Sequence, residues 1–152
     1  MFWADELAAT LDGAQVVNDS KTPSGTVHVG SLRGVVLHDA ITRAIRERGL
    51  PVEFRYGVDD LDPMDSQALL TPDAVDRYMG VPLAQVPAPA GSSAASYARH
   101  FVGEQFMGTF AGLGIMPTIY WMSDLYANGT MDPFIRTALD GAALIRDIYV
   151  RV

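Results

Sequence analysis

Residues 21–31 have the sequence Lys-Thr-Pro-Ser-Gly-Thr-Val-His-Val-Gly-Ser, a turn rich in Gly, Ser and Thr that contains one histidine. A short apolar run, Gln15-Val16-Val17, precedes this turn, and residues 32–48 after it carry apolar side chains at helical spacing. A strand, a loop and a helix in this order direct free backbone N–H groups and the positive end of a helix toward an anion. The sequence therefore predicts a loop that binds nucleotide phosphates.

The pattern beyond this loop extends it to a β-α-β unit. Gly49 ends the predicted helix, and residues 51–58 are rich in β-branched and aromatic side chains, which is typical of a second strand parallel to the first. The buried face of the helix is expected to contain Leu37, Ala40, Ile41 and Ala44. Because ligands of parallel sheets bind beyond the carboxyl ends of the strands, we expect His28 and the acidic run of residues 59–63 at one edge.

Further elements are predicted along the rest of the chain. Residues 1–8 form a short helix, residues 64–95 form a helical and loop insertion with a helix at 72–78, and residues 117–121 form a third strand. Residues 95–113 are helical, with a buried stripe of Tyr97, Phe101, Phe106, Phe110 and Leu113. The last helix is capped by Asp132 and buries Ile135, Ala138, Leu139, Ala142 and Ile145. The fold class is α/β, a Rossmann-like parallel sheet of about three strands with flanking helices.

Composition excludes several classes of protein. The chain has no cysteine, so it holds no disulfide, and no apolar run approaches the ~20 residues that span a bilayer. The N-terminal residues lack the basic region of a signal peptide, so we expect a cytoplasmic location and no membrane partner. A net charge of −7 and a single lysine, Lys21, predict weak binding of nucleic acid phosphates.

The motifs resemble those of the class I lysyl-tRNA synthetases. Thr-Pro-Ser-Gly at residues 22–25 with His-Val-Gly-Ser at 28–31 resembles the class I aminoacyl-tRNA synthetase signature, whose His-x-Gly-x opens the first helix of a Rossmann-type catalytic domain. Further motifs that resemble those of the lysyl enzymes follow in the family's order. They are Leu32-Arg33, Asp59-Asp60-Leu61-Asp62-Pro63, Tyr78-Met79-Gly80-Val81-Pro82 and Ser96-Tyr97-Ala98-Arg99-His100-Phe101. The resemblance as a whole extends from about Val16 to the last residue.

The resemblance implies activation of lysine by ATP with Mg²⁺, followed by transfer to tRNA(Lys). It implies catalytic roles for His28, Gly30 and Ser31, and ATP contacts from Thr22, Ser24, Gly25, His28 and Gly30. Contacts to the amino acid are implied for Ser20, Thr22, Asp59, Asp60 and Asp62. The three aspartates suit either a substrate ammonium group or Mg²⁺, and an aspartate-rich run before proline is also typical of a plain turn. No residue is assigned as the ligand of a protein-bound metal.

Two departures from the family pattern bear on function. The second signature loop, Lys-Met-Ser-Lys-Ser, is missing, since Lys21 is the only lysine. Residues 1–152 therefore resemble the N-terminal half of a catalytic domain, without the C-terminal half or the anticodon-binding domain, and we expect a monomer prone to associate. Family members often have Ser-Gly-apolar where this chain has Asp19-Ser20-Lys21, which bears on the choice of amino acid. The alternatives are another nucleotidyl-transferring enzyme of the superfamily, or a non-catalytic ATP-binding or interaction module.

Overall fold

The computed structural model describes residues 2–25, 27–65 and 71–151, and a parallel sheet lies at its centre. Strands β1 (Gln15–Lys21), β2 (Val52–Val58) and β3 (Thr118–Trp121) lie side by side in that order. Lys21 pairs with Val58, and Val58 with Trp121, so the three carboxyl ends form one edge of the sheet. The predicted α/β class with a three-stranded parallel sheet is confirmed.

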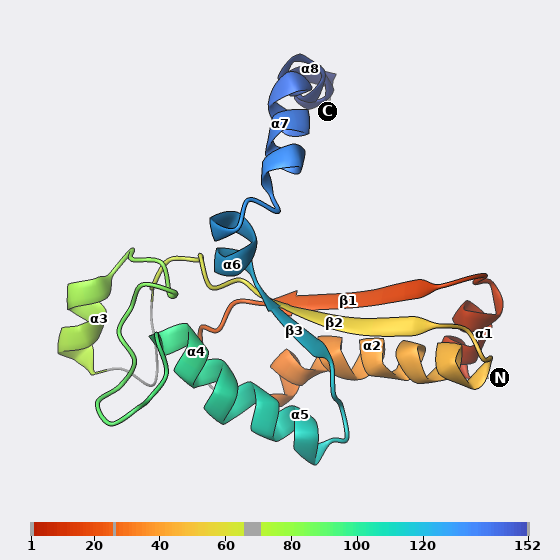
Figure 1. Cartoon of the computed structure of the whole chain (residues 1–152), viewed down its shortest axis with the longest axis horizontal. Helices are drawn as coiled ribbons and strands as arrows, with labels where there is room; N and C mark the ends of the chain where they lie inside the picture. The colour runs from red at the N-terminus through yellow and green to blue at the C-terminus, as the bar shows by residue number, and fades with distance from the viewer. Residues whose placement is uncertain (1, 26, 66–70, 152) are drawn as a thin grey trace.

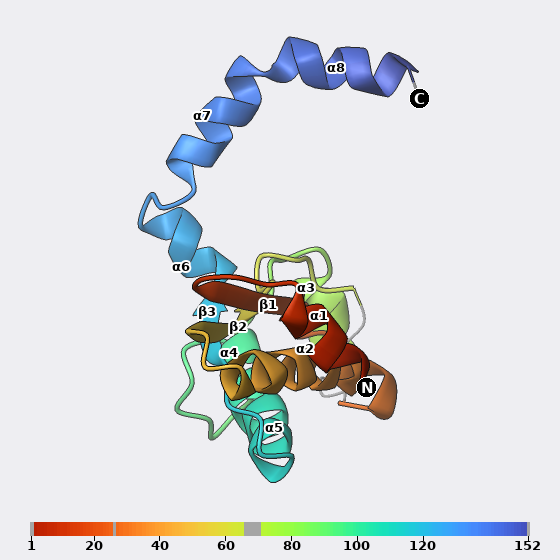
Figure 2. The ribbon, with the colours of Figure 1, turned by 90° about the vertical axis from the view of Figure 1, so that its right-hand side faces the viewer.

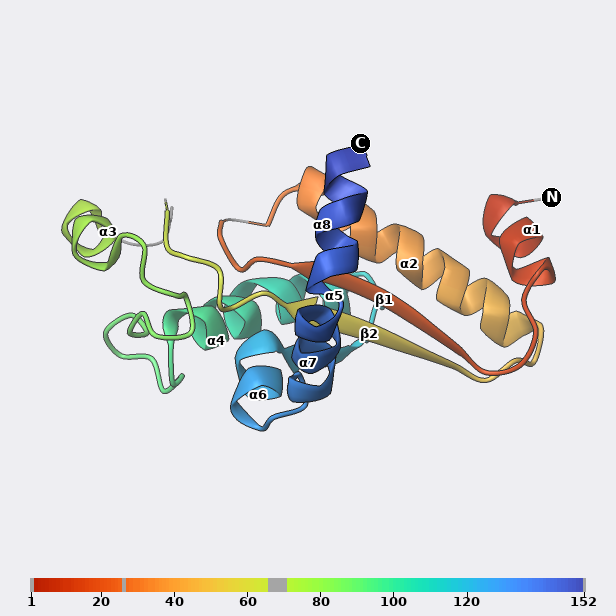
Figure 3. The ribbon, with the colours of Figure 1, turned by 90° about the horizontal axis from the view of Figure 1, so that it is seen from above.

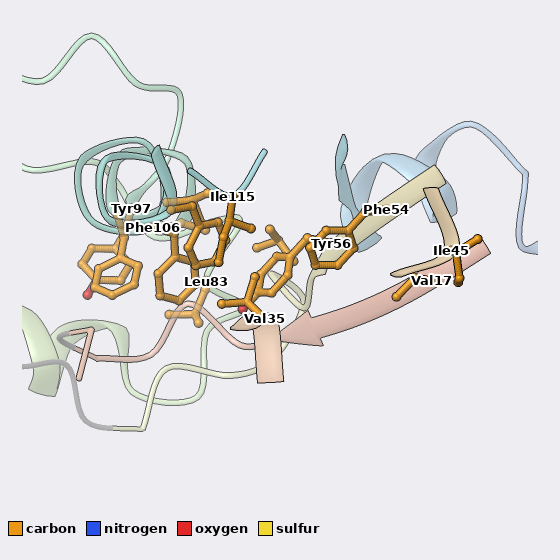
Figure 4. Close-up of a cluster of buried hydrophobic side chains, with 14 of the residues drawn as sticks. Val17, Val35, Ile45, Phe54, Tyr56, Leu83, Tyr97, Phe106 and Ile115 are labelled. Carbon is orange, nitrogen blue, oxygen red and sulfur yellow. The ribbon is translucent and has the colours of Figure 1, made fainter. Parts of the chain in front are cut away.

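One face of the sheet is covered by helices. Figures 1 and 2 show α2 (Val29–Glu47) and the segment α4 (Tyr97–Phe101), η1 (Val102–Met107) and α5 (Gly108–Gly112) on the same side of the strands. Tyr56 of β2 packs edge-on against Phe106 and Phe110, with ring centroids 6.1 and 5.1 Å away. Figure 4 shows the buried side chains of this core, among them Val35 of α2 and Leu83 of the insertion.

The predicted aromatic stripe is buried except at its end. Tyr97, Phe101, Phe106 and Phe110 are buried, whereas Leu113 is 48% exposed, so its assignment to the stripe is wrong. The π-helical turn η1 explains why Phe101 and Phe106, five residues apart, pack with ring centroids 5.3 Å from each other. A strictly α-helical reading of residues 95–113 misses this turn.

Helix α2 begins earlier than predicted, and its predicted buried face is confirmed in part, since Ala44 is buried and Ala40 and Ile41 pack partly buried against the core. It starts at Val29 rather than residue 32, and the predicted Leu37 is 39% exposed. The buried face also contains Asp39 and Thr42, two polar residues that the apolar spacing did not include. Both are satisfied within the helix, because Thr42 Oγ1 donates to the carbonyl of His38 (2.7 Å) and Arg43 Nε donates to Asp39 Oδ2 (2.5 Å).

The insertion lies beyond the carboxyl ends of the strands. Its helix α3 (Pro72–Tyr78) has the predicted bounds and lies clear of the sheet in Figures 1 and 3. Met64, Leu83 and Val86 are buried and anchor the insertion to the core. Part of the predicted insertion, residues 66–70, lies outside the described residues. The short N-terminal helix is confirmed as α1 (Trp3–Ala9), which packs on α2.

The C-terminal helices leave the sheet. After α6 (Met122–Ala127), the predicted single helix is divided at Gly141 into α7 (Asp132–Asp140) and α8 (Ala142–Arg151), which extend away from the strands in Figure 2. The predicted cap is wrong, since Asp132 is the first helical residue and makes no capping bond. The predicted burial is also wrong: Leu139 is 69% exposed, and no residue of α7 or α8 is buried, because no other described element packs over them.

Candidate functional site

The carboxyl-terminal edge of the sheet brings together the two loops that the sequence singled out. Thr22 follows β1 directly and Asp59 follows β2 directly, and the amide of Asp59 donates to the carbonyl of Lys21 (3.1 Å). Thr22 Oγ1 donates to the Oδ2 of Asp62. The structure therefore joins the Thr22–Gly25 segment to the acidic run, as the βαβ geometry predicts.

His28 caps helix α2. Its Nδ1 accepts the amide of Ser31 (3.3 Å), and Ser31 Oγ accepts the amide of His28 (2.8 Å), which makes a reciprocal capping box. Ser31 Oγ can also donate to the carbonyl of His28 (2.8 Å). This cap places an exposed imidazole ring at the positive end of a 19-residue helix whose first turn carries no acid.

Gly30 makes room for the His28 ring. A Cβ atom on Gly30 would lie 2.9 Å from His28 Cε1 and 3.0 Å from Nδ1, closer than side chains tolerate. The glycine is therefore needed for the position of the histidine, besides any approach of a ligand to the backbone. Gly25 differs, since a Cβ there would meet no atom within 4 Å.

The hydroxyl-bearing residues of the loop are partly committed to the protein. The amide of Ser24 donates to the carbonyl of Thr22 (2.9 Å), and the Thr22 hydroxyl donates to Asp62. Thr22 and Ser24 are half-buried, while Ser20 is exposed on the sheet face opposite α2. A phosphate at this edge would meet the helix N-terminus and the loop backbone.

The three aspartates occupy different environments. Burial raises the pKa of Asp59, the hydrogen bond with Ser20 opposes this rise, and the charges of Asp62 and Asp60 add to it. Asp62 is exposed and accepts from Thr22. Asp60 is fully buried, and both of its carboxylate oxygens accept from Ser123, Oδ1 from the amide (2.9 Å) and Oδ2 from the hydroxyl (2.6 Å).

The segment after β3 supplies residues that the sequence analysis did not assign to the site. Ser123 reaches Asp60, and Arg99 of α4 stacks over the Trp121 ring, with Cζ 3.8 Å from its centroid, while Nη2 donates to Asp124 Oδ1 (2.7 Å). The place of Ser123 directly after a third parallel strand was the available signal. No local sequence signal predicts the contact of Arg99 with Trp121, because these two residues lie 22 positions apart in the chain.

On the sheet face opposite α2, next to this edge, the side chain of Tyr120 lies over Gly57 and borders a groove. Gly57 pairs with Ser20 on one side and Tyr120 on the other, and a Cβ on Gly57 would lie 2.6 Å from Tyr120 Oη. Tyr120 therefore lies across the middle strand. It also borders a groove of about 500 Å³ between the sheet and α6–α7, together with Asn18, Arg55 and Phe134.

The edge carries groups that suit an anion and groups that suit a cation. The helix N-terminus with His28 suits phosphate, and the carboxylates of Asp59 and Asp62 suit an ammonium group. Among residues 2–25, 27–65 and 71–151, no three His, Asp or Glu side chains converge in a way that could hold a metal ion. Over the same residues, no helix is long and apolar enough to cross a membrane.

The family model and the similar proteins found by comparison agree on one family. The family model of tRNA synthetases class I (K) matches residues 1–152. The lysine–tRNA ligase of Thermoplasma volcanium is 33% identical over 152 residues, which is 100% of this chain and 30% of that protein. That of Methanosarcina barkeri is 34% identical over 140 residues, 90% of this chain and 26% of that protein. That of Methanocaldococcus jannaschii is 32% identical, covering 97% and 28% respectively. The chain thus spans less than a third of the length of these relatives.

Proposed function

Because the chain belongs to the family of class I (K) tRNA synthetases, we propose that it forms the ATP-binding half of a lysine–tRNA ligase active site. In the first step, a carboxylate oxygen of lysine bonds to the α-phosphorus of ATP, the bond from that phosphorus to its bridging oxygen breaks, and pyrophosphate leaves. In the second step, a hydroxyl at the 3′ end of tRNA(Lys) bonds to the lysyl carbonyl carbon, the bond from that carbon to the phosphate oxygen breaks, and AMP leaves. The observation that carries this proposal is the capped N-terminus of α2, with His28, which follows the Thr22–Gly25 segment that is bonded to the acidic loop at the strand ends.

His28 is proposed to donate a hydrogen bond to the ATP phosphates. Its Nδ1 accepts the Ser31 amide, so the proton of the neutral ring lies on Nε2, which is then the donor. Gly30 and Ser31 hold the ring in this tautomer and place. A preorganised donor at a helix N-terminus stabilises charge that develops on the phosphate oxygens in the transition state.

The loop before His28 is proposed to complete the phosphate site. Thr22, Ser24 and Gly25 contribute backbone and hydroxyl groups there, and the bond from Thr22 to Asp62 fixes the start of the loop. A Mg²⁺ ion carried by the phosphates needs one or two carboxylates, and Asp62 and Asp59 are the accessible ones at this edge. Both contacts belong to the proposal.

The amino acid is proposed to lie over the exposed side of the edge. Ser20 and Asp59 adjoin each other there, and burial together with the charges of Asp62 and Asp60 raises the pKa of Asp59, a shift that a neighbouring cation would oppose. An ammonium group of lysine would supply that cation and lower the pKa of Asp59. Thr22 also belongs to the proposed lysine contacts, whereas the predicted Asp60 is fully buried and bonded to Ser123.

Residues 1–152 are proposed to be the N-terminal half of a Rossmann-type catalytic domain, with the insertion at about 64–95. The sheet face opposite α2 is open beside β1, and Val16 on this face is 56% exposed, which supports further catalytic-domain structure packing there. Stable binding of tRNA(Lys) is assigned to the rest of the synthetase, since this chain carries a net charge of −7. A cytoplasmic location is part of the same proposal.

Calorimetric titration of ATP tests the site with two histidine variants. His28→Ala removes the proposed phosphate donor, while His100→Ala is the matched control, since its ring bonds Ser92 in the insertion. A hydrogen bond to a charged group contributes about 1.5–3 kcal/mol, so His28→Ala should weaken ATP binding by at least about tenfold. His100→Ala should leave it unchanged. A folded wild type that shows no saturable ATP binding would contradict the proposal.

A further inference from the structure

The acidic loop of residues 59–62 is held at three places by other segments. The amide of Asp59 bonds the end of β1, and the carbonyls of Asp60 and Asp62 accept the amides of Ala84 (2.7 Å) and Leu83 (3.0 Å). The third attachment is the side chain of Asp60, which bonds Ser123 twice. The loop is therefore fixed to β1, to the insertion and to the end of β3.

Asp60 differs from its acidic neighbours in what it can contact. It is fully buried, and Ser123 occupies both carboxylate oxygens, so a ligand at the sheet edge does not reach it. A buried carboxylate is costly unless it is hydrogen-bonded, and here one serine supplies both bonds. The position of this serine, at the start of α6 directly beyond β3, is itself stabilised by Arg99 through Trp121 and Asp124.

We propose that Asp60 is a positioning residue, which through its paired hydrogen bonds with Ser123 holds Asp59 and Asp62 at the edge where the substrate binds. We call these two hydrogen bonds the Asp60–Ser123 latch. The latch also helps to fix the phosphate loop, because Asp62 accepts a hydrogen bond from the hydroxyl of Thr22. This inference rests on the proposed function for the nature of the ligand. It assigns substrate contact to Asp59 and Asp62, and removes it from Asp60.

The first experiment is independent of any ligand. Amide hydrogen exchange is compared between the wild-type protein and Ser123→Ala, which breaks one latch bond without leaving a buried charge wholly unpaired. The amides of Asp62, Leu83 and Ala84 should exchange at least about tenfold faster in the variant, while the amides of β1 and β2 keep their rates. Equal rates at the three loop amides would overturn the positioning role. Tyr126→Phe is the control, since it changes an exposed side chain of the same helix.

The second experiment measures binding of a non-hydrolysable lysyl-adenylate analogue. Asp60→Ala and Ser123→Ala should each raise its Kd about tenfold, and the double variant should be no weaker than Asp60→Ala, since the two residues act as one pair. Asp60→Asn should restore binding to within about threefold, because its amide can accept from the Ser123 amide and donate to the Ser123 hydroxyl. A purely structural role predicts lower unfolding temperature with an unchanged Kd in the folded fraction, and that result would overturn the inference.

The two experiments separate the inference from the proposed function. If the wild-type protein binds no analogue but Ser123→Ala accelerates exchange in the loop, the lysine–ATP proposal fails and the latch stands. If the wild-type protein binds the analogue and both latch variants bind it equally well, the proposed function stands and the positioning role fails.

Discussion

Substitution of Gly30 by alanine sets two effects of similar size against each other. The new Cβ would lie 2.9 Å from His28 Cε1, so the imidazole ring must move by roughly half an ångström to reach ordinary contact. The bond from Ser31 N to His28 Nδ1 is already 3.3 Å long and would be lost. Loss of an N-cap costs about 1 kcal/mol, whereas alanine in place of helical glycine contributes about 0.8–1 kcal/mol.

The net change in unfolding free energy of Gly30→Ala should therefore lie within about 1 kcal/mol of zero. Urea unfolding followed by circular dichroism measures it, with Gly108→Ala as the control, because a Cβ there meets no atom within 4 Å. Gly108→Ala should gain up to about 1 kcal/mol. ATP affinity, measured by calorimetry, should fall about tenfold in Gly30→Ala alone as the His28 donor moves. Equal stabilisation of the two variants, with unchanged ATP affinity, would refute the role of the cap.

Three further predictions concern the sheet face, the acidic loop and the C-terminal helices. Gly57→Ala should destabilise the protein by about 1–3 kcal/mol through contact with Tyr120 Oη, and most of this loss should disappear in a Tyr120→Ala background in the same urea assay. Because the folded-state pKa of Asp59 is raised above the ordinary value of 3.8, the wild type loses stability as pH rises from 3.8 through the folded-state pKa. Asp59→Asn should therefore have a higher unfolding temperature than the wild type at pH 7, with no difference below pH 3.8. Leu139→Gln should change the unfolding free energy by less than about 0.5 kcal/mol, since the side chain is 69% exposed, and should reduce self-association in sedimentation velocity.

Local pattern was sufficient for the central part of the fold. The alternation of strand, turn and amphipathic helix around residues 15–58 depends on neighbours in the sequence, and the structure confirms the βαβ unit and its parallel strands. The proximity of Thr22 to the acidic run follows from the same topology. The capping box of His28 and Ser31 was also open to prediction, because it needs only residues three positions apart.

Contacts between distant segments were not predictable in this way. The Asp60–Ser123 pair joins residues 63 positions apart, and nothing in either local sequence selects the partner. Part of the buried face of α2 was missed because Asp39 and Thr42 are polar but satisfied inside the fold. Apolar spacing in α7 and α8 predicted burial, but whether an amphipathic helix is covered depends on which other chain segments reach it.

Selectivity between aminoacyl-adenylate analogues tests the central claim most directly. Non-hydrolysable lysyl- and leucyl-adenylate analogues, which share the nucleotide and differ in the side-chain ammonium group, are titrated into the wild type and into Asp59→Asn. We expect the wild type to bind the lysyl analogue at least about tenfold more tightly than the leucyl analogue. Asp59→Asn should lose this preference but still bind both analogues through the His28 site. Equal binding of the two analogues by the wild type would contradict the assignment of lysine to this edge of the sheet.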